Sequence, residues 1–549
     1  MSNISLQQLQ VIQRCISKVA KDRRVVAACI YGSRVAGYNR PDSDIDLLIV
    51  LENYPYVVKY AYFRESDAKV SALAVDREAL LRDAQSAFLG EFVVGRLLHI
   101  YEPIADAQFL TMIENIYKRR VILEEVRDIL EYTGVLGTEI IFPLEFVAFS
   151  KIKRRMSLYA NAAYSYYKTY TTSQRNIEFA LEGYHKAVAD IISENDEIFV
   201  SRQDGLLQIS DKHKGIEKRA DPLKLTKRLR EFSSYLVHTY AGRKIMHFAI
   251  HEAESKIRRR VRMVMTTPPD FMLSPKKAYW RLPEGIFITD GGNWLDDLAQ
   301  HHFGNGYSVA KKRRLGNQNS RTTLYVLKHF SDEYKVAVKE VAKSKALKWA
   351  MIGLWSAPVK RFRMNPLLRI GSEYKAIRYM RSLGLHTPVI EAVVLDKRLL
   401  VTRFLDGITL ADVIRDCMKG KGDGSLIRKA GAEIAKIHTA GATLGDIKPK
   451  HIIVKDNDLY FTNVEQFILN AGDAAWDISQ FVGWGLKNTQ NSRVAATIIK
   501  EFVEGYVDAG DANNILRLAK NKRYIESFYP VLAPSIVHTI KCEINAIAS

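Results

Sequence analysis

The chain has 549 residues, is 47% hydrophobic and carries a formal net charge of +20 at pH 7. This length predicts about three or four domains, and the hydrophobic fraction excludes a largely disordered chain. The positive charge favours a polyanionic partner such as RNA, although a basic surface that only aids solubility is the alternative. The basic clusters are Lys118–Arg120, Lys151–Arg155, Lys256–Arg262, Lys311–Arg314 and Lys360–Arg363.

No membrane-spanning or secretory segment is predicted. The longest apolar-rich run, near Trp349–Val359, is far too short to span a bilayer, and no signal peptide opens the chain. The cysteines Cys15, Cys29, Cys417 and Cys542 are scattered and show no CxxC spacing. A cytoplasmic protein with reduced thiols and no membrane partner is therefore expected.

The first predicted unit, residues 1–105, opens with an amphipathic helix and then a strand, VVAACIY, at 25–31. After a Gly-Ser turn and a polar loop, Asp44 and Asp46 open a second apolar strand. Because residues two apart in a strand share a face, both carboxylates are expected to point the same way. At about 4 Å and an effective dielectric near 20, like charges repel by roughly 4 kcal/mol. A divalent cation removes that penalty, and hard oxygen ligands suit Mg²⁺ or Mn²⁺.

This spacing resembles the nucleotidyltransferases of the DNA polymerase β-like superfamily, over roughly residues 20–105. Their signature is a Gly-Ser turn followed about a dozen residues later by Asp-x-Asp. The resemblance implies that Gly32 and Ser33 contact nucleotide phosphates and that Asp44 and Asp46 hold the metal. A small turn residue does let backbone N–H groups approach a phosphate. The alternative is a turn followed by a solvated, Asp-rich loop.

One family feature is missing from its expected place. The family usually has a third carboxylate on a later strand, and the strand predicted at Lys69–Val75 contains no acid. Either Asp76, just past its end, takes that role as a metal ligand, or another acid does, or the site has only two ligands and weak chemistry. Asp76 is equally suited to cap the following helix. Arg34, beside the Gly-Ser turn, is a further candidate for contact with phosphate.

The middle region, 106–270, is predicted to be mostly helical. A tract from Arg154 mixes basic residues and tyrosines, which suits phosphate contacts with base stacking, although tyrosines at helical spacing also line cores. A β-hairpin is predicted from Phe199 with its turn at Asp204-Gly205, and a linker at 266–285.

The carboxy-terminal part, 286–549, reads as short strands and then helices. Lys339 lies in a strand after a predicted hairpin, and Glu373 lies in a helix. Asp446 follows in the segment GDIKPKH, and Asp477 in AGDAAWD. This order resembles the protein-kinase-like fold, closest to the atypical archaeal kinases of the RIO family and of the KEOPS tRNA-modification complex.

The resemblance implies roles for these residues. Lys339 matches the lysine that holds ATP phosphates, and Glu373 matches its helix partner. Asp446 matches the catalytic aspartate, Lys448 the lysine beside it, and Asp477 the aspartate that ties the catalytic loop to the next helix.

Two metal-binding positions of this family are altered. His451 replaces an asparagine, and Asn463 replaces the metal-binding aspartate of the Asp-Phe-Gly triplet. A neutral amide should hold Mg²⁺ less well than a carboxylate, unless Glu465 substitutes for it. The segment at the position of the glycine-rich loop also contains only one glycine, Gly316.

The predicted fold is therefore a multidomain α/β and α+β protein with a nucleotidyltransferase fold, a helical middle and a kinase-like fold. The predicted activity is metal-dependent transfer of a nucleotidyl group from an NTP to a hydroxyl acceptor: RNA, protein or a small molecule. One alternative is an atypical protein kinase with a recruiting amino-terminal domain. Another is a non-catalytic, RNA-associated nucleotide sensor.

Overall fold

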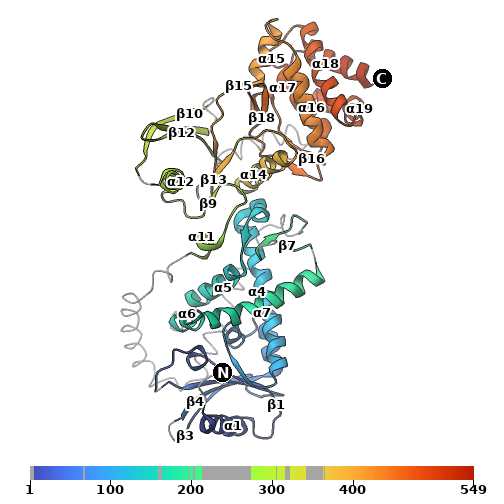
Figure 1. The fold of residues 1–549 in the computed structure, drawn as a ribbon. Helices are drawn as coiled ribbons and strands as arrows, with labels where there is room; N and C mark the ends of the chain where they lie inside the picture. Colours follow the sequence, from blue (N-terminus) through green and yellow to red (C-terminus); the bar gives the residue numbers. More distant parts are fainter. Residues whose placement is uncertain are drawn as a thin grey trace. The chain divides into compact units, whose positions relative to one another are not determined.

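The computed structural model describes residues 5–41, 43–65, 68–158, 163–195, 197–201, 205–212, 274–304, 306–315, 322–341, 363 and 365–548. The chain divides into two compact units (Figure 1). Unit 1 contains residues 1–131 and 141–280, and unit 2 contains residues 132–140 and 281–549. The predicted nucleotidyltransferase segment and the described part of the helical middle region thus belong to one unit.

Unit 1 is built on a five-stranded sheet with the order β3-β4-β2-β1-β5. The central strand β2 pairs antiparallel with β1 and parallel with β4. The three strands expected from the sequence are therefore present and adjacent. The strands are β1 (Val25–Tyr31), β2 (Ile45–Leu51), β3 (Val58–Glu65), β4 (Ala68–Asp76) and β5 (Glu102–Ala105).

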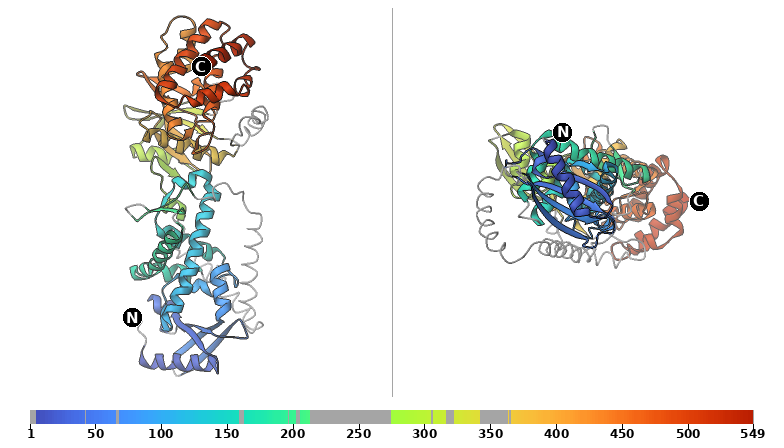
Figure 2. Two further views of the ribbon diagram at one scale, coloured as in Figure 1. Left: turned by 90° about the vertical axis from the view of Figure 1, so that its right-hand side faces the viewer. Right: turned by 90° about the horizontal axis from the view of Figure 1, so that it is seen from below.

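Helix α1 (Leu6–Ala20) covers one face of this sheet, as the left view of Figure 2 shows. It begins with a capping box in which the Ser5 side chain accepts from the backbone N–H of Gln8 and the Gln8 side chain accepts from that of Ser5. The predicted opening helix is confirmed, and its apolar side packs on the alternate residues of β2. The shared core includes Val11, Ile12, Cys15, Ile45, Leu47 and Ile49.

The rest of unit 1 is mainly helical, as predicted for the described part of the middle region. Its helices are α2 (Ser33–Ala36), α3 (Arg77–Ser86), η1 (Val94–Leu98), α4 (Ala107–Thr133, of which the residues to Glu131 belong here), α5 (Leu144–Leu158), α6 (Ala163–Thr171), α7 (Gln174–Glu194) and α11 (Pro275–Tyr279).

A small sheet completes unit 1. Strands β7 (Phe199–Ser201) and β8 (Leu207–Ile209) pair antiparallel, which confirms the predicted hairpin, and β6 (Ile141–Phe142) pairs with β8. Of the predicted turn, Gly205 has the positive φ of 76° that favours glycine, and Asp204 lies outside the described residues. Of the predicted linker, residues 266–273 also lie outside them.

Unit 2 opens with a six-stranded sheet in the order β10-β11-β12-β14-β13-β9, antiparallel except between β13 and β9. These strands are β9 (Ile286–Ile288), β10 (Ser308–Leu315), β11 (Thr322–His329), β12 (Asp332–Glu340), β13 (Ile390–Val394) and β14 (Leu399–Arg403). Helix α12 (Trp294–Phe303) packs on the sheet through Trp294 and Leu298. Helix α14 (Pro366–Ser382) is the predicted helix that carries Glu373.

The second part of unit 2 is a helical bundle with short strand pairs. Its helices are η2 (Gly134–Glu139), α15 (Leu410–Met418), α16 (Ser425–Thr439), η6 (Pro449–His451), α17 (Ala474–Gly485), α18 (Ser492–Ala509), α19 (Asn513–Lys520), α20 (Arg523–Glu526) and α21 (Pro534–Ala548). Its strands are β15 (Ile408–Thr409), β16 (Ala442–Thr443), β17 (Ile452–Lys455), β18 (Asp458–Phe461) and β19 (Ile468–Leu469). None of the described helices combines the length and apolarity that a membrane span needs.

Candidate functional sites

Asp46 lies in a row of polar side chains across the unit 1 sheet. It is paired with Tyr31 on β1 and with Ser71 on β4, and Ser71 is paired in turn with Tyr62 on β3. Residues directly opposite one another on neighbouring strands share a face. The row therefore lies on the face opposite the α1 core, which takes the alternate residues of β2.

The Gly-Ser turn meets Asp46 directly. Gly32 has φ 81° and ψ −156°, a conformation open essentially to glycine alone. A Cβ at this position would overlap Oδ2 of Asp46. Two features therefore require glycine at position 32: the backbone conformation and the closeness of the Asp46 carboxylate. The turn leads into α2, of which Ser33 is the first residue.

Two arginines place positive charge near Asp46. Burial raises the pKa of Asp46 to about 6, Arg96 and Arg34 oppose this rise, and the charge of Asp44 adds to it. Arg96, on η1, donates to the Tyr60 hydroxyl at 2.9 Å and lies over the Tyr31 ring at 5.1 Å. Arg34 donates to the Ser43 carbonyl at 2.6 Å and so fastens the loop before β2.

The three predicted carboxylates are not all brought together. Asp44 is exposed and stands just before β2, so its expected place on the strand is wrong by one residue, but its charge still acts on Asp46. Asp76 accepts from the backbone N–H groups of Glu78 and Ala79 and caps α3. It is paired with Leu51, at the far end of β2 from Asp46. The capping alternative is therefore the correct one, and Asp76 does not join the metal-ligand pair.

Ser71, and not a third acid, is paired with Asp46 on the later strand. Within the described residues there is no group of three or more His, Cys, Asp or Glu side chains that could hold a metal ion. Asp44 and Asp46 still offer carboxylate oxygens, the ligand type that suits Mg²⁺ or Mn²⁺.

A buried ion cluster that the sequence analysis missed holds η1 in place. Glu91 pairs with Arg120 at 2.8 Å, Lys151 at 2.7 Å and Arg155 at 2.8 Å. Although burial opposes it, these cations hold the pKa of Glu91 well below its ordinary value. Arg155 also donates to the Glu91 carbonyl and the Tyr166 hydroxyl. The cluster thereby ties α4, α5 and α6 to the segment that carries Arg96.

The same contacts show that part of the basic, tyrosine-rich tract is buried. Arg155 is 2% exposed, and Arg154 pairs with Glu125 and Asp128. Tyr167 and Tyr170 are buried. Arg155, Tyr167 and Tyr170 therefore line the core of unit 1, whereas the Arg154 side chain is 33% exposed and Tyr164 is 50% exposed.

In unit 2, Lys339 lies among three predicted site residues. Its Nζ is 2.6 Å from Glu373 and 3.2 Å from Glu465, and it donates to Oδ1 of Asn463. Burial lowers the pKa of Lys339, but the two carboxylates outweigh it and raise the pKa above the ordinary value. Glu465 is also held by Arg369, on α14, at 2.6 Å.

A chain of hydrogen bonds joins Lys339 to the segment that carries Asp446. Asn463 Nδ2 lies 3.0 Å from His451 Nε2, and His451 Nδ1 lies 3.3 Å from the Asp446 carbonyl. Burial lowers the pKa of His451 to about 3, so its ring is neutral at physiological pH. The amide donates to Nε2, and the proton of the ring therefore sits on Nδ1. The two altered family positions contact each other.

Asp446 and Asp477 are linked to the loop at residues 444–448. The Asp446 carboxylate pairs with Lys448 at 2.8 Å. Asp477 accepts from the backbone N–H groups of Leu444 and Gly445 and so fixes the loop before Asp446. The structure thus brings Lys339, Glu373, Asn463, Asp446 and Lys448 to one site, while Gly316 lies outside the described residues.

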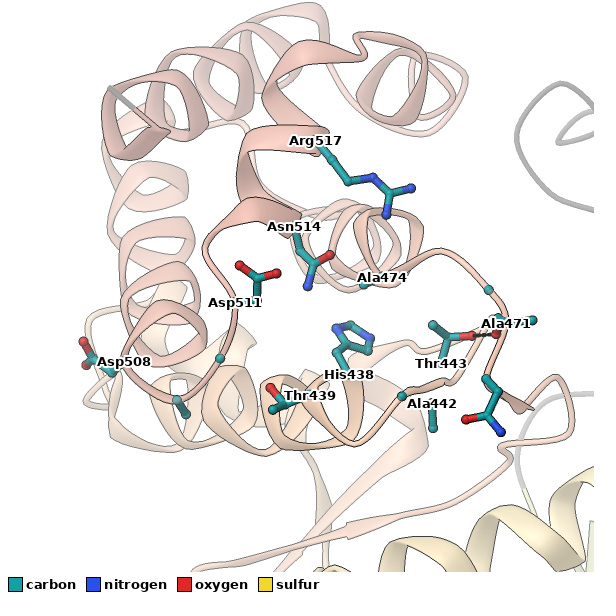
Figure 3. Close-up of a pocket in the computed structure, with 15 residues that line it drawn as sticks. His438, Thr439, Ala442, Thr443, Ala471, Ala474, Asp508, Asp511, Asn514 and Arg517 are labelled. Atoms are coloured by element: carbon teal, nitrogen blue, oxygen red, sulfur yellow. Dashed lines mark hydrogen bonds between the residues drawn. The ribbon is translucent and has the colours of Figure 1, made fainter.

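A cavity of about 810 Å³ lies elsewhere in unit 2, among α16, α18 and α19. Figure 3 shows Asp511, Asn514 and Thr443 arranged around His438. His438 lies 3.2 Å from Asp477 through Nε2 and 2.7 Å from the Tyr506 hydroxyl through Nδ1. Both ring nitrogens are engaged, so the histidine supports the loop through Asp477 and does not offer a free nucleophile.

Comparisons with known proteins bear on unit 1. Residues 13–92 match the model of the family described as Polymerase beta, Nucleotidyltransferase. This supports the predicted nucleotidyltransferase domain and, at that level, a transferase that uses a nucleotide. A search of curated proteins finds no match. One similar solved structure is "WaaP in complex with acyl carrier protein", 12% identical, covering 44% of this chain and 98% of that chain with a TM-score of 0.26, too low to support an inference.

Proposed function

We propose that unit 1 transfers a nucleotidyl group from an NTP to a hydroxyl acceptor, and that unit 2 binds ATP in a kinase-like site that is partly degenerate. The observation that carries the first part is the contact between Gly32 and Asp46. It joins the two halves of a sequence signature, and a Cβ at Gly32 would destroy it. The family match over residues 13–92 supports the same activity.

In this proposal each residue of unit 1 has a limited task. Gly32 and Ser33 keep the turn narrow enough for phosphate to approach, and Arg96 and Arg34 supply positive charge near the phosphates. Asp46 and Asp44 would hold Mg²⁺ or Mn²⁺. When bound, the metal neutralises phosphate charge and makes the acceptor hydroxyl more acidic.

For unit 2, the pairing of Lys339 with Glu373 and of Asp446 with Lys448 supports a site for ATP. Asn463 contributes an amide oxygen without charge, and Lys339 already occupies that oxygen. Metal binding is therefore weak in this proposal, and phosphoryl transfer is slow. We also propose that the protein is cytoplasmic and that the acceptor is a protein, an RNA or a small molecule.

The rival functions make different predictions for labelled nucleotides. Purified protein is incubated with Mg²⁺ or Mn²⁺ and an NTP labelled at either the α- or the γ-phosphate. Transfer of the α label to an acceptor supports the proposal. Transfer of the γ label alone would instead support a protein kinase whose amino-terminal domain recruits substrate. Nucleotide binding with neither transfer would support a sensor.

A further inference from the structure

A group of aromatic rings, of which Phe330 is exposed, lies at one end of the unit 2 sheet and has no role in the sites described above. Phe330, in the turn between β11 and β12, is 91% exposed and has φ 53°. His329 stacks on Phe303 with ring centroids 5.4 Å apart and 14° between planes. Phe330 meets His329 edge-on at 4.5 Å, and Tyr334 meets Phe303 at 5.9 Å. These rings form a continuous group, which we call the aromatic tip.

The basic strand β10 begins beside this tip. Ser308 is paired with Lys328, two residues before Phe330, and Arg314 is paired with Thr323 at the other end. β10 is the last strand of its sheet, with no second strand beside it among the described residues (Figure 1). Lys312 and Arg313 are exposed, and Lys312 lies over the Tyr325 ring at 5.1 Å. At about 3.3 Å per residue, the basic edge extends roughly 20 Å from the tip.

Protection of an open sheet edge explains only part of this arrangement. Lysine and arginine on an edge strand do discourage pairing with another chain. They do not account for Phe330, which is 91% exposed and follows β11 at the end of the strand pair opposite Arg314. Lys312 is paired with Tyr325, five residues before Phe330, so one open edge carries cations along its length and an exposed ring at its end. Cations that contact phosphates and rings that stack on bases together bind single-stranded nucleic acid.

We propose that β10 and the aromatic tip form a binding surface for single-stranded nucleic acid. Phosphates follow the open edge of β10, from which Lys312 and Arg313 project to opposite faces of the sheet, and a base stacks on Phe330. The proposal goes beyond the nucleotidyl transfer proposed for unit 1 and does not depend on it, because binding is measured here without NTP or metal. It also assigns the polyanion partner to a surface in unit 2 instead of the tract that contains the buried Arg155.

The test measures binding of the full-length protein to a fluorescent 12-residue oligouridylate by anisotropy, across salt concentrations. Phe330→Ala should weaken binding about tenfold, from loss of one stacked base. Lys312→Gln with Arg313→Gln should reduce the slope of log affinity against log salt by roughly 1.4, since each phosphate contributes about 0.7. Phe330 is almost fully exposed, so its replacement leaves the fold intact.

Matched controls are Tyr529→Ala, which removes another exposed ring of unit 2, and Lys419→Gln with Lys421→Gln, which removes the same charge elsewhere. Both should bind like the unchanged protein. Binding that falls equally in the controls, or no binding at 50 mM salt, would overturn the proposal. So would a preference for duplex over single strand. Loss of binding to phosphatidylserine vesicles in Phe330→Ala, with oligouridylate binding unchanged, would identify a membrane surface instead.

Discussion

Asp46 is the residue on which the proposed chemistry of unit 1 depends most. Asp46→Asn should lower metal-dependent α-phosphate transfer by at least about two orders of magnitude, because metal assistance supplies several kcal/mol. Stability without metal should hold or rise, since the change removes a buried charge that lies near Asp44. Asp76→Ala is the contrasting variant: loss of the α3 cap should cost about 0.5–2 kcal/mol while transfer persists. Full transfer by Asp46→Asn would refute the assignment.

Asn463 and His451 should be considered together, because they contact each other. Asn463→Asp alone places a carboxylate against the unprotonated Nε2 of His451, and the gain in Mg²⁺ dependence should be small. Asn463→Asp with His451→Asn restores both family ligands and should strengthen the Mg²⁺ dependence of ATP binding, measured by calorimetry. If the unchanged protein already shows strong Mg²⁺ dependence and fast γ-phosphate transfer, Glu465 or another acid supplies the missing ligand.

Glu433, on α16, gives stability a dependence on pH that is separate from both sites. Burial raises its pKa to about 7, and Oε2 has no hydrogen-bond partner among the described residues. A raised pKa means that the folded state keeps its proton after the unfolded state has lost it. Stability is therefore lost as pH rises from about 4.5 to about 7, by up to about 3 kcal/mol.

Glu433→Gln should remove this loss. Urea denaturation should show the variant more stable than the unchanged protein at pH 8 and nearly equal at pH 4.5. Glu526→Gln is the control with the opposite dependence on pH. Lys541 holds the pKa of Glu526 below its ordinary value, so this pair stabilises the folded state only at higher pH. An equal effect of Glu433→Gln at both pH values would contradict the argument.

At the scale of elements, the sequence predicted what periodicity and local motifs determine. The strands β1, β2 and β4 and the helices α1 and α14 lie where expected, because burial on one face leaves a regular spacing of apolar residues. Asp76 could not be decided from sequence, since a cap and a ligand both use a carboxylate at a strand end. The buried Arg155 could not be recognised either, because its partner Glu91 is 64 residues away in the chain.

The turn between β1 and α2 allows an element-scale test. Gly32→Ala should abolish transfer, because the new Cβ displaces Asp46, and should also strain the backbone by about 1–3 kcal/mol. Gly37→Ala is the matched control: Gly37 also has φ 81°, and a Cβ there has no atom within 4 Å. Its αL backbone tolerates alanine at about 1–2 kcal/mol. Folded Gly37→Ala protein should therefore keep its transfer activity, and loss of activity in both variants would mean that strain alone is responsible.

At the scale of the whole molecule, two compact units each carry a candidate nucleotide site. Chains of several units often unfold in more than one step, so we expect two transitions in calorimetry.

A ligand that binds only the folded state stabilises it by about 2.7 kcal/mol at one hundred times its Kd. ATP with Mg²⁺ should therefore raise both transitions. Asp46→Asn should remove the Mg²⁺-dependent rise of one transition, and Lys339→Ala should remove the rise of the other. If ATP raises the temperature of only one transition, and only Lys339→Ala abolishes that rise, then unit 1 does not bind this nucleotide. Repeating the scan with other NTPs would then show whether unit 1 selects a different base.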